Sequence, residues 1–568
     1  MKKTLAGILS LICCSAMAFG AGCGGLGGES DEWYEEIDAS KTQLYVSNLK
    51  GGIGHEWLMK AKTRFESAYA EESFEDGKKG VQVVVDTDNS VNGAWLILPS
   101  SEWEVFFTEN LPFNDYVSQG QILDISDVVK TPAYGETETI ESKLDDEQRA
   151  GLTAYDGKYY VIPHYEAYRG ISYNVQVFED YKLFFADEKD NGNGGFIVRN
   201  SDKRAPGPNG VYGDYDDGLP ATVDEFFQLC DRMVLVGVKP FVWPGASIAY
   251  SEYIVDAFAE AFMGAEELKY NYSFDSGDET AKVITGFNAE TPVVEEKSIS
   301  NDNGYLIRQQ AGKYYGYAVF QKIIDKIDSY VYSLSNNNST FTHYDSQEEF
   351  LTGEFENQPI GMIADGNYWW NEANNSGAYQ RTVNQFGERA KAENRNFAWM
   401  PVPGVWSAEE GETPVTQPVL KDTMRSYCFI NANISDRPHK VAAAKAFVSF
   451  CYTDESLREF TQTTGVAKGL KYELSDTEYA SLGSLAKSCW SLRQNASVVR
   501  LLSANRMFIE NQYDFTSYLH TSTVSGQPYQ TPFTAFKAKV SAKDYFLGTW
   551  ISESDWKKKY SKYFTSGL

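Results

Sequence analysis

Three aromatic residues follow one another in the stretch GNYWWNEA, at Tyr368, Trp369 and Trp370. The apolar run GMIAD just before them predicts a buried strand. Because a strand alternates its faces, three adjacent rings cannot all enter one core. Asn, Gly and Glu surround the rings. The stretch therefore predicts flat apolar faces beside groups that donate and accept hydrogen bonds.

Similar combinations occur where other predicted strands end, after the runs EVFFT, YYVIP and KPFV. A sugar ring has an apolar C–H face and hydroxyl edges, so a saccharide site needs aromatic platforms with polar side chains beside them. The candidate ligand-binding residues are Glu109, Asn110, Tyr165, Glu166, Trp243, Tyr368, Trp369 and Trp370. The alternative for each ring is ordinary packing in a core or between lobes.

Motifs for covalent or cofactor chemistry are missing from the sequence. The five histidines form no H-E-x-x-H pair, and there is no G-x-S-x-G elbow and no phosphate-binding loop. Gly52-Ile-Gly54 begins like a dinucleotide fingerprint but lacks the third glycine. We therefore expect no catalytic residue, no cofactor and no metal. The 79 acidic residues still leave open a carboxylate pair for glycoside hydrolysis.

Predicted strands and helices alternate along the chain. The apolar periodicity and the capping residues predict strands over 43–48, 81–86 and 104–108, and helices over 55–69, 222–237, 438–451 and 454–464. This alternation predicts an α/β fold with mostly parallel sheets. Ligands of such sheets gather at the carboxyl ends of the strands, which here are Asn48, residues 86–89 and Glu109-Asn110.

Length and charge restrict the classes of partner. A chain of 568 residues predicts two or more domains. Hydrophobic residues make up 42% of the sequence, which excludes wholesale disorder. The formal net charge of −28 opposes nucleic acid and anionic membrane surfaces as partners, because both would be repelled.

The N-terminus has the composition of a targeting segment. Lys2 and Lys3 precede an apolar run over 5–19, and small residues lead to Cys23, a pattern that resembles a bacterial lipoprotein signal. We expect residues 1–22 to be removed, Cys23 to carry a lipid and residues 23–40 to serve as a tether. Gly20 departs from the motif, which usually has Leu there. A plain secretory signal is the alternative.

Cysteines and acidic loops give weaker signals. The remaining cysteines, Cys230, Cys428, Cys451 and Cys489, form no C-x-x-C pair and are expected to be buried thiols, with one disulfide left open.

Polar insertions are expected as loops over 187–218, 273–303 and 407–416. The acidic runs 187–190 and 214–218 suggest calcium but lack EF-hand spacing, so solvated loops are preferred.

Several motifs follow one another in a definite order. After the lipoprotein-like start come YYVIP running into ISYN, GMIADG with its aromatics, NFAWMPVPG, and FINANIS before KVAAAKAF. This order resembles the extracellular solute-binding proteins of ABC transporters, family 1, the maltose-binding-like group. Each motif alone is loose, but their order spans nearly the whole mature chain. The family's aromatic residue corresponds to Tyr368, where Trp is common. Which of Tyr368, Trp369 and Trp370 would stack on a ligand therefore stays open.

The resemblance implies a two-lobed, type II periplasmic-binding-protein-like fold that closes on its ligand about a hinge. Each lobe would be a mixed, mostly parallel sheet flanked by helices and built from discontinuous segments. The chain would cross near 165–169, 403–421 and 472. The first lobe would comprise 41–166 plus 421–473, and the second 167–420 plus 474–568.

The implied activity is capture rather than catalysis. Such a protein would bind a saccharide, expected to be an oligosaccharide, and deliver it to ABC transporter permease subunits. It would act as a monomer, extracytoplasmic and held to the outer face of the bacterial cytoplasmic membrane through its lipid alone. The alternatives are a secreted glycan-active hydrolase and a cell-surface carbohydrate-binding protein without a transporter.

Overall fold

The computed structural model describes residues 36–86, 94–336, 338–408, 413–515 and 520–564. Cys23, the expected signal over 1–22, most of the tether and the strand-end residues 87–89 lie outside the described residues. Their roles therefore stay predictions. Among the described residues, no helix is both long and apolar enough to cross a membrane.

The first sheet has the strand order β2-β1-β3-β12-β4. β1 (Thr42–Asn48) pairs in parallel with β2 (Val81–Asp86) and with β3 (Val105–Thr108). β12 (Tyr427–Ile430) joins from a distant part of the chain and runs antiparallel to β3 and to β4 (Ile162–Pro163). We call this sheet and the helices packed on it the first lobe.

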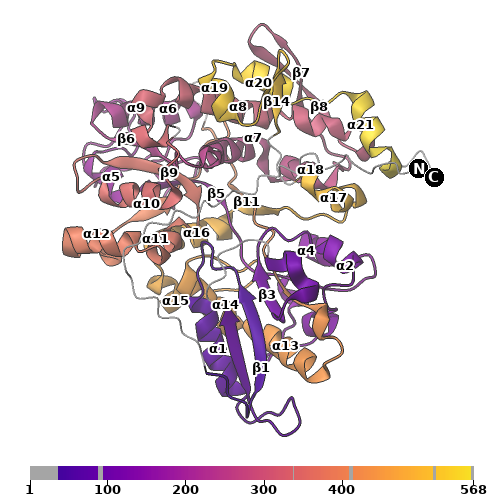
Figure 1. The fold of residues 1–568 in the computed structure, drawn as a ribbon. Coiled ribbons are helices and arrows are strands. Elements are labelled where there is room, and N and C mark those ends of the chain that lie inside the picture. The colour runs from indigo at the N-terminus through magenta and orange to yellow at the C-terminus, as the bar shows by residue number, and fades with distance from the viewer. Residues whose placement is uncertain (1–35, 87–93, 337, 409–412, 516–519, 565–568) are drawn as a thin grey trace, which may run out of the picture. The chain divides into compact units, whose positions relative to one another are not determined.

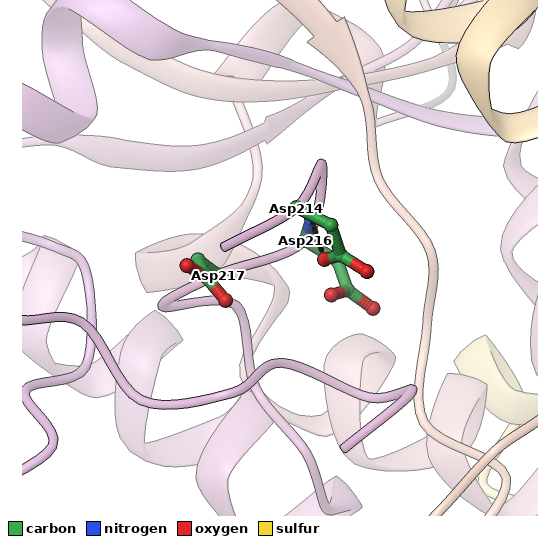
Figure 2. Close-up of side chains that lie close together, drawn as sticks. All are labelled: Asp214, Asp216 and Asp217. Atoms are coloured by element: carbon green, nitrogen blue, oxygen red, sulfur yellow. Dashed lines mark hydrogen bonds between the residues drawn. The ribbon is translucent and has the colours of Figure 1, made fainter. Parts of the chain in front are cut away.

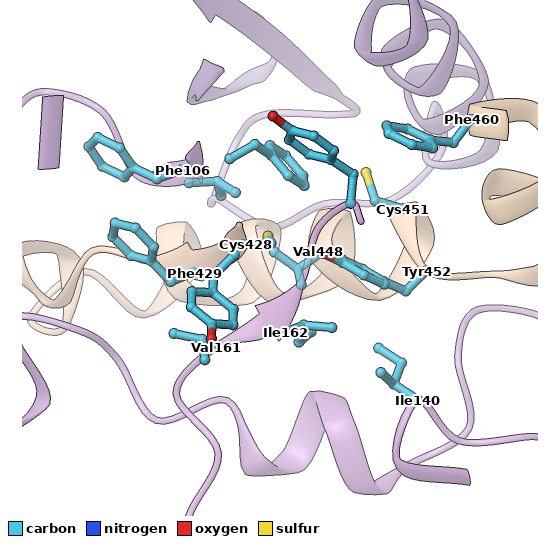
Figure 3. Packing of buried hydrophobic residues seen from close by; sticks show 14 of the residues in the cluster. Phe106, Ile140, Val161, Ile162, Cys428, Phe429, Val448, Cys451, Tyr452 and Phe460 are labelled. Atoms are coloured by element: carbon cyan, nitrogen blue, oxygen red, sulfur yellow. The ribbon is translucent and has the colours of Figure 1, made fainter. Parts of the chain in front are cut away.

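Helices that are far apart in the sequence cover the first sheet (Figure 1). α1 (Glu56–Ala68) packs with α13 (Pro438–Cys451) and α14 (Asp454–Thr464), and Gly465 ends α14 in the left-handed region at φ +72°. Their apolar stripes form the core seen in Figure 3, where the rings of Phe106 and Phe429 stack with centroids 5.0 Å apart.

The second sheet has the strand order β10-β5-β9-β6. β5 (Arg169–Asn174) runs antiparallel to β10 (Phe397–Trp399) and to β9 (Ile360–Gly366), while β6 (Lys239–Val242) is parallel to β9. Every residue of β9 is buried. We call this sheet and its helices the second lobe.

Of the other helices in the described residues, α6, α7 and α8 are the longest, and they pack in the second lobe. In chain order they are α2 (Phe113–Ser118), α3 (Ser126–Lys130), α4 (Asp146–Leu152), α5 (Val175–Asp180), α6 (Val223–Leu235), α7 (Glu252–Ser273), α8 (Ala311–Asp325), α9 (Ile327–Tyr330), α10 (His343–Thr352), α11 (Trp369–Asn375), α12 (Ala378–Phe386), α15 (Asp476–Ser481), α16 (Ser484–Asn495), α17 (Arg506–Glu510), α18 (Gln512–Phe515), α19 (Pro532–Lys537), α20 (Ala542–Gly548) and α21 (Glu553–Tyr560).

The chain passes between the lobes at places that lie close together. β4 belongs to the first sheet and β5 to the second, so one passage lies between Pro163 and Arg169. Beside it, β11 (Val419–Asp422) pairs in parallel with β13 (Ser497–Arg500). A bridge between Tyr168 and Asp422 joins the two parts. We call these segments the hinge, and the lobe bounds given above remain predictions.

Most predicted elements are confirmed, with two differences. The stretch 273–303 was expected as a loop, but it contains the hairpin of β7 (Ala281–Asn288) and β8 (Thr291–Lys297). The sheets also hold more antiparallel pairs than expected, since β12 runs antiparallel to β3 and β4, and β5 runs antiparallel to β9 and β10. A further short hairpin pairs β14 (Ser522–Val524) with β15 (Gln527–Tyr529).

The predicted thiols are confirmed as buried and free at Cys230, Cys428, Cys451 and Cys489. Two of them, Cys428 and Cys451, lie in the first-lobe core (Figure 3). A thiol in such surroundings acts as a small apolar group.

Candidate functional site

Tyr368 lies where the second lobe meets the first. β9 delivers the chain to this point, and Tyr368 immediately precedes α11. Its side chain is only 4% exposed and packs against the glycine turn of the first lobe, so closely that a Cβ atom on Gly52 would lie 2.6 Å from Cδ2 of Tyr368. One turn further on, the Asn371 amide donates to the carbonyl of Ile53 at 3.0 Å. The contact between the lobes is therefore centred on the Tyr368 ring.

Glu109 and Tyr165 approach the same turn from the first lobe. The Tyr165 hydroxyl donates to a carboxylate oxygen of Glu109. That oxygen would lie 3.2 Å from a Cβ on Gly51. Burial raises the pKa of Glu109, although the hydrogen bond from Tyr165 and the charge of Arg169 oppose the rise. Glu109 is therefore a hydrogen-bonding group next to the Tyr368 contact.

Asn110 follows Glu109 in the left-handed region, at φ +54°, a conformation that Asn adopts more readily than most residues. Its backbone N–H donates to the carbonyl of Met424 at 2.8 Å, and its side chain is partly exposed. The contacts of Asn110 thus tie this strand end to the hinge, and its role toward a ligand stays a prediction.

Two of the predicted platforms are core residues of the second lobe. Trp243 is fully buried, and its indole N–H donates to the carbonyl of Ser335 at 3.0 Å. Trp369 is also fully buried and donates to the hydroxyl of Ser172 at 3.1 Å. Both rings have their polar atom satisfied inside the lobe. In this structure both are packing residues of the second-lobe core, and their role toward a ligand stays a prediction.

Trp370 is partly buried and packs beside the second sheet. Its ring centroid lies 5.2 Å from that of Tyr379 and 5.5 Å from that of Phe397. These partners belong to the apolar cluster that contains Trp369. Of the three consecutive rings, Tyr368 is thus the one that meets the first lobe.

Glu166 belongs to the hinge. It is fully buried, and its two oxygens accept from Arg493 and Arg500 at 2.6 Å each, while Tyr168 donates a further hydrogen bond. Burial alone would raise the pKa of Glu166, but the two guanidinium groups hold it at about 2. These cations occupy the carboxylate in this structure, and the ligand-binding role of Glu166 stays a prediction.

Arg169, Tyr250 and Tyr253 complete the surroundings of Tyr368 and were not predicted. Cζ of Arg169 lies 4.9 Å from the centroid of the Tyr253 ring, and the rings of Tyr250 and Tyr253 are 4.9 Å apart. Burial raises the pKa of Tyr368, and the neighbouring Tyr253 adds to the rise. One signal could have found the tyrosines. They are three residues apart, Tyr250 in the 3₁₀ turn Ile248–Ser251 and Tyr253 in the first turn of α7, and this spacing places them on one face.

A buried carboxylate pair lies behind Tyr368. The side-chain amide of Gln347 donates to Asp365 at 3.1 Å and to Glu372 at 2.9 Å. Burial raises the pKa of both groups, and the charge of Asp365 raises that of Glu372 further. Because a carboxyl group with a raised pKa holds its proton, such a pair can both donate and accept hydrogen bonds.

Comparison with known proteins identifies the architecture. No protein-family model and no curated protein sequence matches the chain. A structure described as SBP RafE in complex with raffinose matches with a TM-score of 0.50 and 15% identity, covering 89% of this chain and 100% of that one. A chitin oligosaccharide binding protein matches with a TM-score of 0.50 and 14% identity, covering 92% and 99%. The chain has the two-lobed fold of the solute-binding proteins.

Where the two lobes meet, the structure brings together Glu109, Tyr165, Arg169, Tyr250, Tyr253, Asp365, Tyr368 and Glu372. They combine aromatic rings with groups that donate and accept hydrogen bonds, which is the chemistry that a neutral polyhydroxylated ligand requires.

Proposed function

We propose that this protein is an extracytoplasmic solute-binding protein that captures a saccharide between its lobes and delivers it to the permease of an ABC transporter. The observation that carries the proposal is Tyr368, a ring presented by one lobe to the other and surrounded by hydrogen-bonding side chains. The fold is the same as that of proteins described as binding raffinose and chitin oligosaccharides, which supports the choice of ligand class.

An oligosaccharide suits the site better than a single sugar. Tyr250, Tyr253 and Tyr368 lie close to one another, and successive sugar units can each use an aromatic face. Desolvated carboxyl groups beside the rings would bind the hydroxyl edges.

Delivery to a permease requires that the protein stay near the membrane. A lipid on Cys23 would provide this anchor, with the following residues as tether. Mass spectrometry of the native N-terminus should find a diacylglycerol-modified Cys23. An unmodified start at another residue would exclude the anchor without affecting ligand capture.

Ligand capture is tested by thermal unfolding against a library of oligosaccharides, followed by calorimetry. A ligand at 100 times its dissociation constant stabilises the folded state by about 2.7 kcal/mol, which gives a measurable rise in melting temperature. The sugar should be recovered intact. An increase in reducing ends would instead indicate a glycan-active hydrolase, and no response to any saccharide would contradict the proposal.

A further inference from the structure

A tight turn in the second lobe buries an aspartate. Asp216 is only 1% exposed, and one of its carboxylate oxygens, Oδ2, accepts from the backbone N–H of Asn209 at 3.1 Å. Gly207 passes so close to this residue that a Cβ there would lie 2.0 Å from the carbonyl oxygen of Asp216. The chain thus folds around Asp216 and holds its carboxylate in place.

Two more carboxylates lie on the same turn, those of Asp214 and Asp217 (Figure 2). One oxygen from each of the three aspartates lies within 4.8 Å of the others. Since oxygen ligands bind Ca²⁺ at about 2.4 Å, two ligands of one ion can lie up to about 4.8 Å apart. The spacing of the three groups therefore fits a single ion.

The hydrogen bonding of these aspartates is incomplete. Oδ1 of Asp216 and Oδ1 of Asp217 are both buried, and neither has a hydrogen-bond partner among the described residues. Arg204 acts on Asp217 electrostatically, but its guanidinium group pairs with Glu179 at 3.4 Å. Buried carboxylate oxygens without a partner are costly, and a bound cation would satisfy them.

We propose that Asp214, Asp216 and Asp217 form a Ca²⁺ site. The three side chains offer only oxygen, which Ca²⁺ prefers and which zinc sites with their nitrogen and sulfur ligands do not resemble. Main-chain carbonyls and water would complete the coordination. The site revises the sequence-based preference for a solvated loop, because that interpretation did not foresee the burial of Asp216.

The ion would also act on a region near the hinge. Asp216 lines a cavity of about 40 Å³ whose wall includes Tyr168 and Arg169, at the start of β5. Binding of Ca²⁺ would fix the turn that forms one side of this cavity. We therefore expect the ion to stabilise the second lobe whether or not a saccharide is present.

The test uses the purified protein after removal of cations with a chelator. Tb³⁺ is the probe, because Tyr215 lies between two of the ligands and can transfer excitation energy to it. We expect Tb³⁺ emission that Ca²⁺ reverses, and a higher melting temperature in 1 mM Ca²⁺. Asp216→Asn should weaken binding by at least about ten-fold. The matched control Asp190→Asn, in an exposed acidic run, should bind like the unaltered protein.

If Asp216→Asn fails to fold, the exposed Asp214→Asn tests the same site and should also weaken binding. Absence of both Tb³⁺ emission and a Ca²⁺-dependent melting shift in the unaltered protein would overturn the proposal. Equal binding by the unaltered protein and the Asp214 and Asp216 variants would do so too. If Mg²⁺ displaced Tb³⁺ as effectively as Ca²⁺ does, the assignment to calcium would be overturned.

Discussion

Tyr368 and Trp243 are both buried aromatic residues, but their surroundings predict opposite effects of substitution. Tyr368→Ala removes a ring at the contact between the lobes and should weaken saccharide binding roughly five- to a hundred-fold, the equivalent of about 1 to 3 kcal/mol. Trp243→Ala leaves a cavity in the second-lobe core and should cost about 3 to 5 kcal/mol of stability. Calorimetric titration and denaturant unfolding of both variants separate the two effects. Unchanged affinity of Tyr368→Ala would show that this ring is packing only.

Glu252, at the start of α7, should make the free protein more stable as the pH is lowered. Burial raises its pKa from 4.5 to about 8, and the charge of Asp256 adds to the rise. A carboxyl group whose pKa is raised on folding binds more protons in the folded state, so stability rises as pH falls from about 8 toward 4.5.

Glu252→Gln removes this titration. Its melting temperature should therefore change less across that pH interval than that of the unaltered protein. Glu388→Gln, at an exposed position, is the control. Equal pH dependence in all three proteins would show that Glu252 does not contribute.

At the scale of elements, the hinge is held by a buried ion-pair network. Glu166 accepts from Arg493 and Arg500, so Glu166→Gln leaves the buried guanidinium group of Arg493 without its carboxylate partner, while Arg500 keeps its pair with Asp145. Loss of one partner from such a network should destabilise the fold by about 3 to 5 kcal/mol. Glu388→Gln, which removes an exposed pair with Lys391, should cost about 1 kcal/mol or less. Denaturant unfolding measures both, and similar small losses would contradict the assigned role.

The same network has a pH dependence opposite to that of Glu252. The pKa of Glu166 is lowered on folding, so its contribution to stability is present above about 4.5 and is lost as the pH falls toward 2. The most stable condition for the free protein should therefore lie between these two effects, in mildly acidic solution.

Local signals explain which elements could be predicted from the sequence. Thr222 caps α6 by accepting from the backbone N–H of Glu225, and Gly465 ends α14, as their positions in the sequence indicate. The hairpin of β7 and β8 escaped prediction because most of its second strand is exposed and shows no buried alternation. Its turn at Ala289 lacks the usual glycine, although φ there is +54°.

The candidate site was only partly predictable, because the packing partners of its residues are distant in the sequence. The sequence places aromatic residues at strand ends, and Tyr368 is one that reaches the contact between the lobes. The partners of Glu166 are 327 and 334 residues away in the sequence. No local sequence pattern therefore indicated that its carboxylate pairs with two arginines at the hinge. Trp243 and Trp369 follow predicted strands as Tyr368 does, so the local sequence does not distinguish the three rings. Only tertiary packing shows that Trp243 and Trp369 are core residues and that Tyr368 contacts the first lobe.

At the scale of the whole molecule, the structure has the lobes in contact. The glycine turn of the first lobe packs on Tyr368, and Asn371 reaches across to the carbonyl of Ile53. If a saccharide binds on the Tyr368 ring, the lobes must separate to admit it. The balance between the open and closed arrangements then depends on how well Gly52 and Tyr368 fit together.

Gly52→Ala tests this balance directly. The added Cβ would lie 2.6 Å from Cδ2 of Tyr368 and 3.1 Å from its Cβ, at the base of the side chain where the ring cannot simply turn away. Such overpacking costs about 1 to 3 kcal/mol, and it acts only on the closed arrangement, so the ratio of closed to open protein should fall roughly five- to a hundred-fold. X-ray scattering should therefore give a larger radius of gyration for the free variant. Gly286→Ala, whose new Cβ would meet nothing within 4 Å, should scatter like the unaltered protein. An unchanged radius for Gly52→Ala would mean that the Tyr368 contact does not control closure.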